Sequence, residues 1–386
     1  MGDSLRVVVA GGGVAGLEAI LALRDLAGDR VALTLVSPEA EFVFRPMAVA
    51  EPFSRGHAAR HPLAAVARHA GADLVRARVK EVDAGERHVV LDDGGRIPYD
   101  ALLVAVGARS EPALRHALTW TPEADRELFG GLLRDVEEGY ARRVAFVVPP
   151  VIGWPLPAYE LALMTAWEAS GMGAEVDVAV YTPETAPLAM FGAAASAALR
   201  AELEEIGVRV VTGVEVRDGD GGLVGDPGGR VDAQRAVALP RAAGPALPGL
   251  PADEDGFVPA DAHGRVADGV WAAGDAMDFP VKQGGLAAQE ADAAAEAIAA
   301  AAGADVEPRP FRPVLRGVLL TGRGRRWMRL ESGQEEGETA RHALWWPPTK
   351  VAGRYLSPYL GAIEDAEVVG GAATPDGHPV ELDLAH

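Results

Sequence analysis

The sequence predicts an α/β protein with two successive three-layer domains, each built around a parallel sheet, followed by a small C-terminal α+β cap domain. Two observations indicate this class. Short β-branched runs alternate with helical stretches along most of the chain. The same order of strand, glycine or proline turn, helix and strand begins near residue 5 and again near residue 143. With 386 residues, of which 49% are hydrophobic, the chain can fill two or three cores.

Short apolar runs define the expected elements. We expect strands at residues 6–10, 31–37, 101–106, 144–148, 176–181, 208–211 and 269–272. Glycine-rich residues 218–229 predict a hairpin or loop, because short β runs flank them. Residues 286–302 are rich in alanine but contain three acidic residues, so they predict a soluble helix rather than a membrane span.

Proline and arginine cluster at residues 307–313 and predict a domain boundary. We expect three domains. The first is discontinuous and is formed by residues 1–112 and 244–307. The second covers residues 113–243, and the cap domain covers residues 308–386.

Composition excludes several classes of function. The chain has 36 basic and 56 acidic residues, a net charge of −20, which disfavours nucleic acid as a partner. It has no cysteine, so no disulfide and no thiolate chemistry are expected. Its histidines are scattered, so no metal site is expected either. The N-terminal residues run into a strand without a leader pattern, which predicts a cytoplasmic protein that begins here.

The first strand–turn–helix unit carries a dinucleotide-binding motif. Gly11 allows the tight turn, Gly13 lets the backbone approach a pyrophosphate, and Gly16 lets the helix pack on the strand. The cofactor candidates here also include Val14 and Ala15, at the start of the helix. An acidic residue usually follows the second strand and binds a ribose hydroxyl. Either Ser37 or Glu39 is a candidate for that position.

Two distant segments decide between NAD and FAD. One strand ends in Ala105-Val106-Gly107, and another ends in Gly274-Asp275. With the glycine motif, these segments make the sequence resemble the two-dinucleotide-domain flavoproteins of the pyridine nucleotide-disulfide reductase superfamily. The resemblance implies two tandem Rossmann-like domains and bound FAD, with Asp275 on the ribityl chain and Val79 among the cofactor contacts.

Residues 41–47 narrow the resemblance. They are similar to the aromatic-x-Phe-x-Pro segment of sulfide:quinone oxidoreductases, flavocytochrome c sulfide dehydrogenases and type II NADH dehydrogenases. In those proteins the segment lies beside the isoalloxazine, which would make Pro46 a rigid wall and Arg45 a cation for reduced flavin or an anionic substrate. Alternatively Arg45 is a surface residue. We expect Phe42 and Phe44 to serve packing.

The same resemblance places the N-terminus of the helix at 286–302 by the pyrimidine edge of the flavin. Lys282, Gln283 and Gly284 precede it and are cofactor candidates. A helix N-terminus favours the negative charge of reduced flavin, and Lys282 would add a full positive charge. The alternative for Lys282 is a solvated lysine at a helix start.

The second strand–turn–helix unit departs from a nucleotide site. Pro149 and Pro150 stand where an NAD(P)H site has glycines, and they count against NAD(P)H binding because they remove backbone donors. The segment resembles the sulfide:quinone oxidoreductase pattern, with Trp154 near the place of its cysteine. Trp154, Tyr159 and Glu160 are candidate catalytic residues, together with Arg45 and Lys282. Glu160 is either a proton relay or a carboxylate that stabilises the helix start.

Aromatic residues mark the C-terminal region. They predict an apolar face. This face makes either a weak peripheral contact with the inner face of a membrane or a domain or homodimer interface. Its members are Trp345, Trp346, Tyr355, Leu356, Tyr359 and Leu360, with Lys350 and Arg354 at its edge.

The sequence predicts an FAD-dependent oxidoreductase that passes two electrons from a small donor to a quinone or another acceptor. The absence of cysteine excludes persulfide and disulfide chemistry. An NAD(P)H-dependent flavin dehydrogenase and a non-catalytic FAD-binding or sensor protein remain alternatives.

Overall fold

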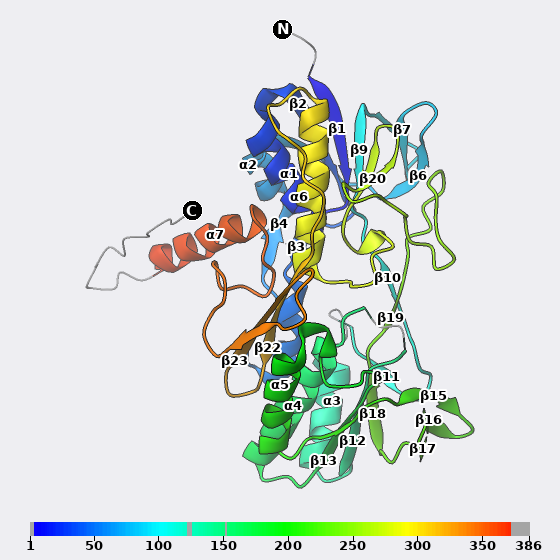
Figure 1. The fold of residues 1–386 in the computed structure, drawn as a ribbon, viewed down its shortest axis with the longest axis vertical. Helices are drawn as coiled ribbons and strands as arrows, with labels where there is room; N and C mark the ends of the chain where they lie inside the picture. The colour runs from blue at the N-terminus through cyan, green and yellow to red at the C-terminus, as the bar shows by residue number, and fades with distance from the viewer. Residues whose placement is uncertain (1–3, 122–125, 151–152, 372–386) are drawn as a thin grey trace.

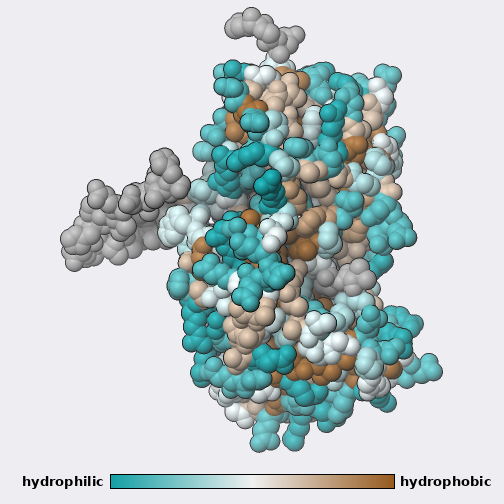
Figure 2. All heavy atoms as spheres, viewed as in Figure 1, coloured by the Kyte–Doolittle hydropathy of each residue, from teal (hydrophilic) through white to brown (hydrophobic). Residues whose placement is uncertain are grey.

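The computed structural model describes residues 4–121, 126–150 and 153–371. Two α/β units lie one above the other along the long axis of the molecule, and a C-terminal sheet and helix lie against them (Figure 1). The face in Figure 2 is mostly hydrophilic, with hydrophobic residues in small groups. In the described part of the chain, no helix combines the length and apolar character needed to cross a bilayer.

The first unit is built on a six-stranded sheet of order β20-β21-β9-β1-β2-β5, parallel except for β20. Its strands are β1 (Leu5–Ala10), β2 (Val31–Val36), β5 (Ala72–Val75), β9 (Ala101–Val104), β20 (Arg265–Ala267) and β21 (Val270–Ala272). These strands come from two distant parts of the sequence, so the first sheet is discontinuous.

Alternation along the strands gives this sheet two buried faces. Val7 and Val9 pack against helices α1 (Val14–Ala27) and α6 (Gly284–Ala301), whereas Val8 and Ala10 pack toward a three-stranded antiparallel sheet. That sheet consists of β6 (Val79–Asp83), β7 (His88–Leu91) and β8 (Arg96–Pro98). The unit therefore has three layers, as predicted.

The second unit repeats this plan. Its five strands are all parallel, in the order β11-β18-β12-β13-β14. They are β11 (Leu118–Thr119), β12 (Arg143–Val147), β13 (Asp177–Tyr181), β14 (Arg209–Val211) and β18 (Arg235–Ala238). Helices α3 (Arg126–Glu137), α4 (Leu156–Met172) and α5 (Ala193–Glu205) contribute to the core on one face. The other face packs on β15 (Glu215–Gly219) and β16 (Gly222–Asp226), which with β17 (Gly229–Arg230) form the predicted hairpin region.

Shorter elements complete the fold. Two chain segments that connect the units pair as β10 (Arg109–Glu111) and β19 (Arg241–Ala243). The first unit also contains β3 (Glu41–Val43), β4 (Arg60–Pro62), α2 (Leu63–His69) and the 3₁₀ segments η1 (Gly28–Arg30), η2 (Arg45–Phe53) and η4 (Gly274–Ala276). The second contains η3 (Ala189–Phe191), and the C-terminal region contains β22 (Val314–Leu320), β23 (Arg325–Glu331), β24 (Glu338–Ala340) and α7 (Leu356–Gly371). The predicted α/β class and all seven predicted strands are confirmed; the domain bounds stay predictions.

The C-terminal region bridges the two units. Leu315, Leu319 and Met328 of its sheet join the core that contains α4 and α5. Leu356 and Leu360 at the start of α7 join the core of the first unit. This docking spreads the C-terminal apolar residues over both units.

Leu356 and Leu360 therefore follow the domain-interface alternative of the prediction, whereas the membrane contact and the homodimer interface stay predictions. Leu356 and Leu360 are buried, and the side chain of Lys350 is buried too. Trp345 packs edge to face on Trp327, with 4.6 Å between ring centroids. Trp346 is 77% exposed.

A carboxylate on α1 holds the start of α7. The Glu18 side chain is fully buried and accepts hydrogen bonds from the backbone amides of Tyr355 (2.7 Å) and Leu356 (2.8 Å). Asp292 on α6 faces Glu18 and has a buried Oδ1 that no hydrogen bond reaches in the described residues. Burial, and then the charge of Glu18, raise the pKa of Asp292 to about 8. This contact between two carboxyl groups therefore holds a proton at neutral pH.

The proton on Asp292 makes stability depend on pH. Its pKa rises from 3.8 in the free residue to about 8 in the fold, so the folded state binds an extra proton between these values. The free energy of unfolding therefore falls as pH rises through this window, by up to about 1.4 kcal/mol per pH unit for this group. We expect Asp292→Asn to remove that share of the slope, measured by urea unfolding of the full-length protein between about pH 5 and pH 8. Asp25→Asn, at an exposed aspartate of α1, should keep the wild-type slope, and an unchanged slope in Asp292→Asn would contradict the assignment.

Candidate functional site

The residues predicted to bind a cofactor meet at one edge of the first sheet. Strands β1, β2, β5, β9 and β21 run parallel, so their carboxyl ends lie together. The candidates that follow these strands are Gly11, Gly13, Val14, Ala15, Gly16, Ser37, Glu39, Ala105, Val106, Gly107, Gly274 and Asp275. Val79 begins β6, four residues after β5, and is half-buried. We call this group the FAD edge.

The glycines of the first turn have distinct physical roles. Gly11 has φ +121°, and a Cβ there would lie 2.1 Å from the carbonyl oxygen of Ala105. A Cβ on Gly16 would lie 1.9 Å from the carbonyl oxygen of Gly11. A Cβ on Gly13 would meet nothing within 4 Å, so the backbone at the start of α1 faces open space. The first amides of α1 have no partner within the helix, and an approaching pyrophosphate can accept their hydrogen bonds.

The two candidates after β2 act as one unit. Ser37 is fully buried, and its Oγ donates a hydrogen bond of 2.9 Å to Glu39 Oε2. Glu39 is exposed at the FAD edge. Ser37 therefore orients the carboxylate, and Glu39 is the residue free to accept a ribose hydroxyl.

Charged groups of opposite sign surround Asp275. Burial raises the pKa of its carboxyl, while the charges of Lys282 and Arg45 oppose that shift. No hydrogen bond from the described residues reaches the Asp275 carboxylate, which leaves it able to accept bonds from ligand hydroxyls. Lys282 Nζ donates to the carbonyl of Met277 and lies 3.8 Å from the ring centroid of Phe257.

Glu290 belongs to the same group, although sequence reasoning assigned it no role. It lies on α6, the helix that begins just after Lys282. Its Oε2 accepts the backbone amide of Gly274 at 2.7 Å. Burial raises the pKa of Glu290 to about 8. The carboxyl thus fixes the backbone beside Asp275. The sequence offered one signal of this role, the position of Glu290 in an alanine-rich helix, because a charged residue among small apolar residues need not face solvent.

The N-terminus of α6 is fixed by its cap. Gln283 Oε1 accepts the amide of Leu286 at 2.8 Å, and its Nε2 donates to the carbonyl of Arg316 at 3.1 Å. A Cβ on Gly284 would lie 3.0 Å from Val351 and 3.7 Å from Val14. The starts of α1 and α6 therefore lie together, with the C-terminal segment beside them.

Pro46 connects the FAD edge to a buried ion pair. Pro46 lies in η2, and its carbonyl accepts a hydrogen bond from Lys350 Nζ at 3.1 Å. Lys350 Nζ also contacts Glu160 Oε1 at 2.6 Å, and that oxygen accepts the amide of Leu320 at 2.8 Å. Burial raises the pKa of Glu160 and lowers that of Lys350, and their mutual contact opposes both shifts. The predicted packing role of Phe42 and Phe44 agrees with their edge-to-face contact, with centroids 6.5 Å apart.

The side chain of Tyr159 contacts a different partner from that of Glu160, and its predicted catalytic role stays a prediction. Glu160 and Tyr159 are adjacent on a helix, so their side chains diverge. Tyr159 is fully buried, and its hydroxyl donates to Glu184 Oε2 at 2.6 Å, at the end of β13. Trp154 packs edge to face on Phe191, and a Cβ on neighbouring Gly153 would lie 2.9 Å from the amide nitrogen of Lys282.

This arrangement can be compared with known proteins. The family described as pyridine nucleotide-disulphide oxidoreductase matches residues 5–301. The chain belongs to this family. It is an FAD-dependent oxidoreductase. The glycine turn, the open space at Gly13 and the free Asp275 carboxylate fit that cofactor.

The chain is similar to one curated protein in sequence and to several solved structures in fold. The ferredoxin reductase component of chlorobenzene dioxygenase from Cupriavidus sp. (strain PS12) is 29% identical over 322 residues, which cover 78% of this chain and 74% of the relative. The sulfide:quinone oxidoreductase of Aquifex aeolicus superposes with a TM-score of 0.78 at 19% identity and covers 95% of this chain and 91% of its own. A ferredoxin reductase of Rhodopseudomonas palustris gives a TM-score of 0.61 at 18% identity, covering 88% and 91%. The two structures show a shared fold.

In the described residues of the second unit, the turn before α4 differs from the glycine turn before α1. Pro149 and Pro150 follow β12, and residues 151 and 152 lie outside the described residues. Helix α4 has Pro155 as its N-cap and Pro157 in its first turn, so two backbone donors are missing where α1 offers amides. The acid after β13, Glu184, already accepts bonds from Tyr159 and Thr182.

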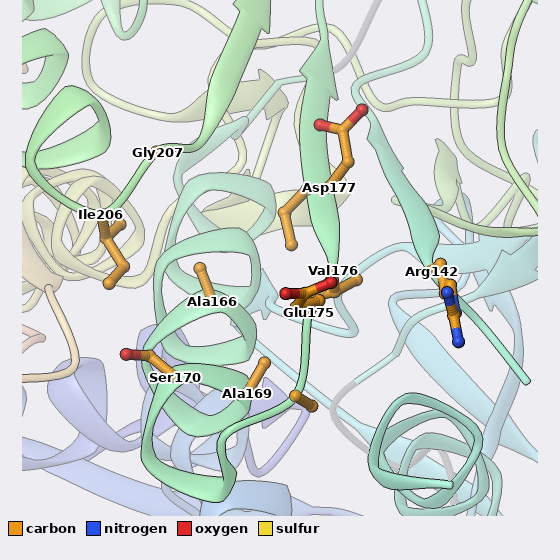
Figure 3. Close-up of a pocket in the computed structure, with 11 residues that line it drawn as sticks. Arg142, Ala166, Ala169, Ser170, Glu175, Val176, Asp177, Ile206 and Gly207 are labelled. Carbon is orange, nitrogen blue, oxygen red and sulfur yellow. The ribbon is translucent and has the colours of Figure 1, made fainter. Parts of the chain in front are cut away.

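The second unit also contains a cavity of about 540 Å³ away from the ion pair (Figure 3). Asp177 and Val176 line it at the amino end of β13, with Ser170 near the end of α4. Ligands of parallel α/β sheets bind at the carboxyl edge, so this cavity is not the family's nucleotide site. In the described ranges, no cluster of three or more histidine or acidic residues forms a metal site.

The open space at Gly13 predicts how FAD binding responds to a methyl group. We expect Gly13→Ala to fold normally, since its φ of −84° suits any residue, but to bind FAD at least about tenfold more weakly because Cβ enters the pyrophosphate space. FAD titration and thermal unfolding of the apoprotein measure the two effects. Gly171→Ala, at an exposed helix position with open space, is the control; it should leave FAD affinity unchanged and raise the unfolding temperature slightly, because alanine favours the helix. Equal FAD affinity in Gly13→Ala and wild type would refute this role.

The ion pair predicts non-additive stability effects. Glu160→Ala leaves Lys350 buried without its carboxylate and should cost about 3–5 kcal/mol. The double variant Glu160→Leu/Lys350→Met should recover most of this loss, because it removes both charges. Urea unfolding of the wild type, Glu160→Leu, Lys350→Met and the double variant gives the interaction energy. If the two single losses simply add, the ion pair does not couple the parts of the structure.

Proposed function

We propose that this enzyme oxidises a small-molecule donor and passes the two electrons to a quinone or another small acceptor. FAD supplies the two-electron redox chemistry. The observation that carries the proposal is the contrast between the starts of α1 and α4. The first offers amides to a dinucleotide, and the second has prolines at the corresponding place. The donor therefore need not be a pyridine nucleotide bound at the second unit.

The side chains around the site support redox chemistry without cysteine. The chain contains none, so no thiolate carries sulfur or exchanges with a disulfide. Lys282 and the N-terminus of α6 supply positive charge beside Asp275. Glu160 and Lys350 hold exchangeable protons next to the carbonyl of Pro46. Reduction of a quinone to a quinol takes up two protons, and this pair is our candidate for holding one of them.

A second candidate is NAD(P)H-dependent reduction of a small electron-carrier protein. The relative from Cupriavidus, described as a ferredoxin reductase component, favours it. Glu184 also follows β13 as Glu39 follows β2. Against it stand the prolines around the start of α4 and the bonds that already occupy Glu184.

Anaerobic mixing separates the two candidates. We expect the flavin absorbance of the enzyme to persist when NADH or NADPH is added, because α4 lacks the donors for a second pyrophosphate. After chemical reduction, a soluble quinone should reoxidise the flavin rapidly. A ferredoxin reductase of known nicotinamide specificity serves as the positive control. Rapid bleaching by either nicotinamide would replace this proposal with the second candidate.

A further inference from the structure

Two arginines lie directly opposite each other in the C-terminal sheet. Arg316 of β22 and Arg329 of β23 are paired in the antiparallel register. Side chains at such positions are neighbours on one face, and like charges there destabilise the sheet. Arg325 lies on the same face by alternation along β23. By the same register Glu331 and Glu338 lie on this face, so the three arginines there stand beside two carboxylates.

The guanidinium of Arg316 has no direct partner. Its side chain makes no hydrogen bond or ion pair with any residue that the structure describes, although it is half-buried. Its Nε and that of Arg329 are both buried without a hydrogen-bond partner. Arg329 bonds to Glu331, so the nearby carboxylate is already engaged. Burial, and then the charge of Arg329, lower the pKa of Arg316, while Glu331 opposes that shift.

An unbalanced, half-buried guanidinium is costly unless an anion binds to it. Guanidinium groups bind carboxylate and phosphate oxygens with two parallel hydrogen bonds, and two adjacent arginines can hold one anion between them. The side chain of Arg329 is 34% exposed, so solvent and small solutes reach the pair. Glu331 bonds to Arg329 and Glu338 lies opposite it on β24, so Arg316 is the arginine of the pair without a carboxylate partner among the described residues.

The pair is physically connected to the FAD edge. The carbonyl of Arg316 accepts the side-chain amide of Gln283, which caps α6 and directly follows Lys282. Trp327, on the same face of β23, packs on Trp345 of the segment that leads to Lys350. A ligand at Arg316 is thus held by β22, the strand that fixes the start of α6 through Gln283.

We propose that Arg316 and Arg329 form a binding site for the carboxylate or phosphate group of a small-molecule substrate. The assignment of this substrate as the electron donor rests on the proposed function, because a quinone acceptor carries no net charge. The anion site itself does not depend on which donor is used.

Binding of simple anions to the FAD-loaded, full-length enzyme tests the site without turnover. Inorganic phosphate and succinate are titrated by calorimetry at constant ionic strength set with chloride. We expect saturable binding to the wild type and at least about tenfold weaker binding to Arg316→Gln and Arg316→Lys, since lysine lacks the planar fork. Arg341→Gln is the matched control, because this arginine already pairs with Glu202 at 3.1 Å and lies outside the face.

Thermal unfolding distinguishes binding from a structural role. Without added anion, Arg316→Gln should unfold at the same temperature as wild type or higher, because it removes an uncompensated charge. With saturating phosphate or succinate, the wild type should gain stability and the variant should not. Failure of both anions to bind the wild type, or equal binding by Arg316→Gln, would overturn the site. If nicotinamide reduces the flavin while anion binding still depends on Arg316, the proposed donor fails and the anion site stands.

Discussion

The ammonium group of Lys350 joins three parts of the molecule that are far apart in the sequence. It contacts the carboxylate of Glu160 in the second unit and the carbonyl of Pro46 in the first, while the same carboxylate accepts an amide of β22. Removing these charges from water is costly, and the cost is offset only when all the partners are in place. The ion pair therefore disfavours any arrangement in which the C-terminal segment separates from the units. It also fixes η2, the segment that contains Arg45.

The two units show how one fold can serve two different purposes. Both have a parallel sheet with helices on one face and antiparallel strands on the other. Even the turns after the second strands match, since Ser37 bonds to Glu39 and Thr182 bonds to Glu184 two residues further along. The difference lies in the helix starts. Glycine at α1 leaves amides and space, whereas among the described residues proline at the start of α4 removes two amides.

The sequence predicted the features that depend on local pattern. Buried parallel strands are continuous apolar runs, and the glycine motif is specified by contacts within a short stretch, so both could be recognised. Contacts between distant residues left no local signal. Lys350 lies 190 residues from Glu160 in the chain, and as a lysine among aromatic residues it resembled the polar border of a surface. Tyr159 and Glu160 are adjacent in sequence, yet the helix directs them to different partners.

The acidic residues of α6 were predicted only to mark an alanine-rich segment as a soluble helix, but in the structure they make specific contacts. Three carboxyl groups along this helix each contact a different element. Glu290 accepts an amide of Gly274 at the FAD edge, Asp292 faces Glu18 beneath the start of α7, and Glu296 pairs with Arg309 at 2.5 Å and Arg354 at 3.5 Å.

Because these three contacts share one rigid helix, the position of α6 sets the geometry of the FAD edge and the docking of the C-terminal helix together. A displacement of α6 that weakened one contact would strain the others. Order at the cofactor edge and order in the C-terminal region therefore both depend on carboxyl groups of one helix, which links the cofactor unit physically to the region that bridges it to the second unit.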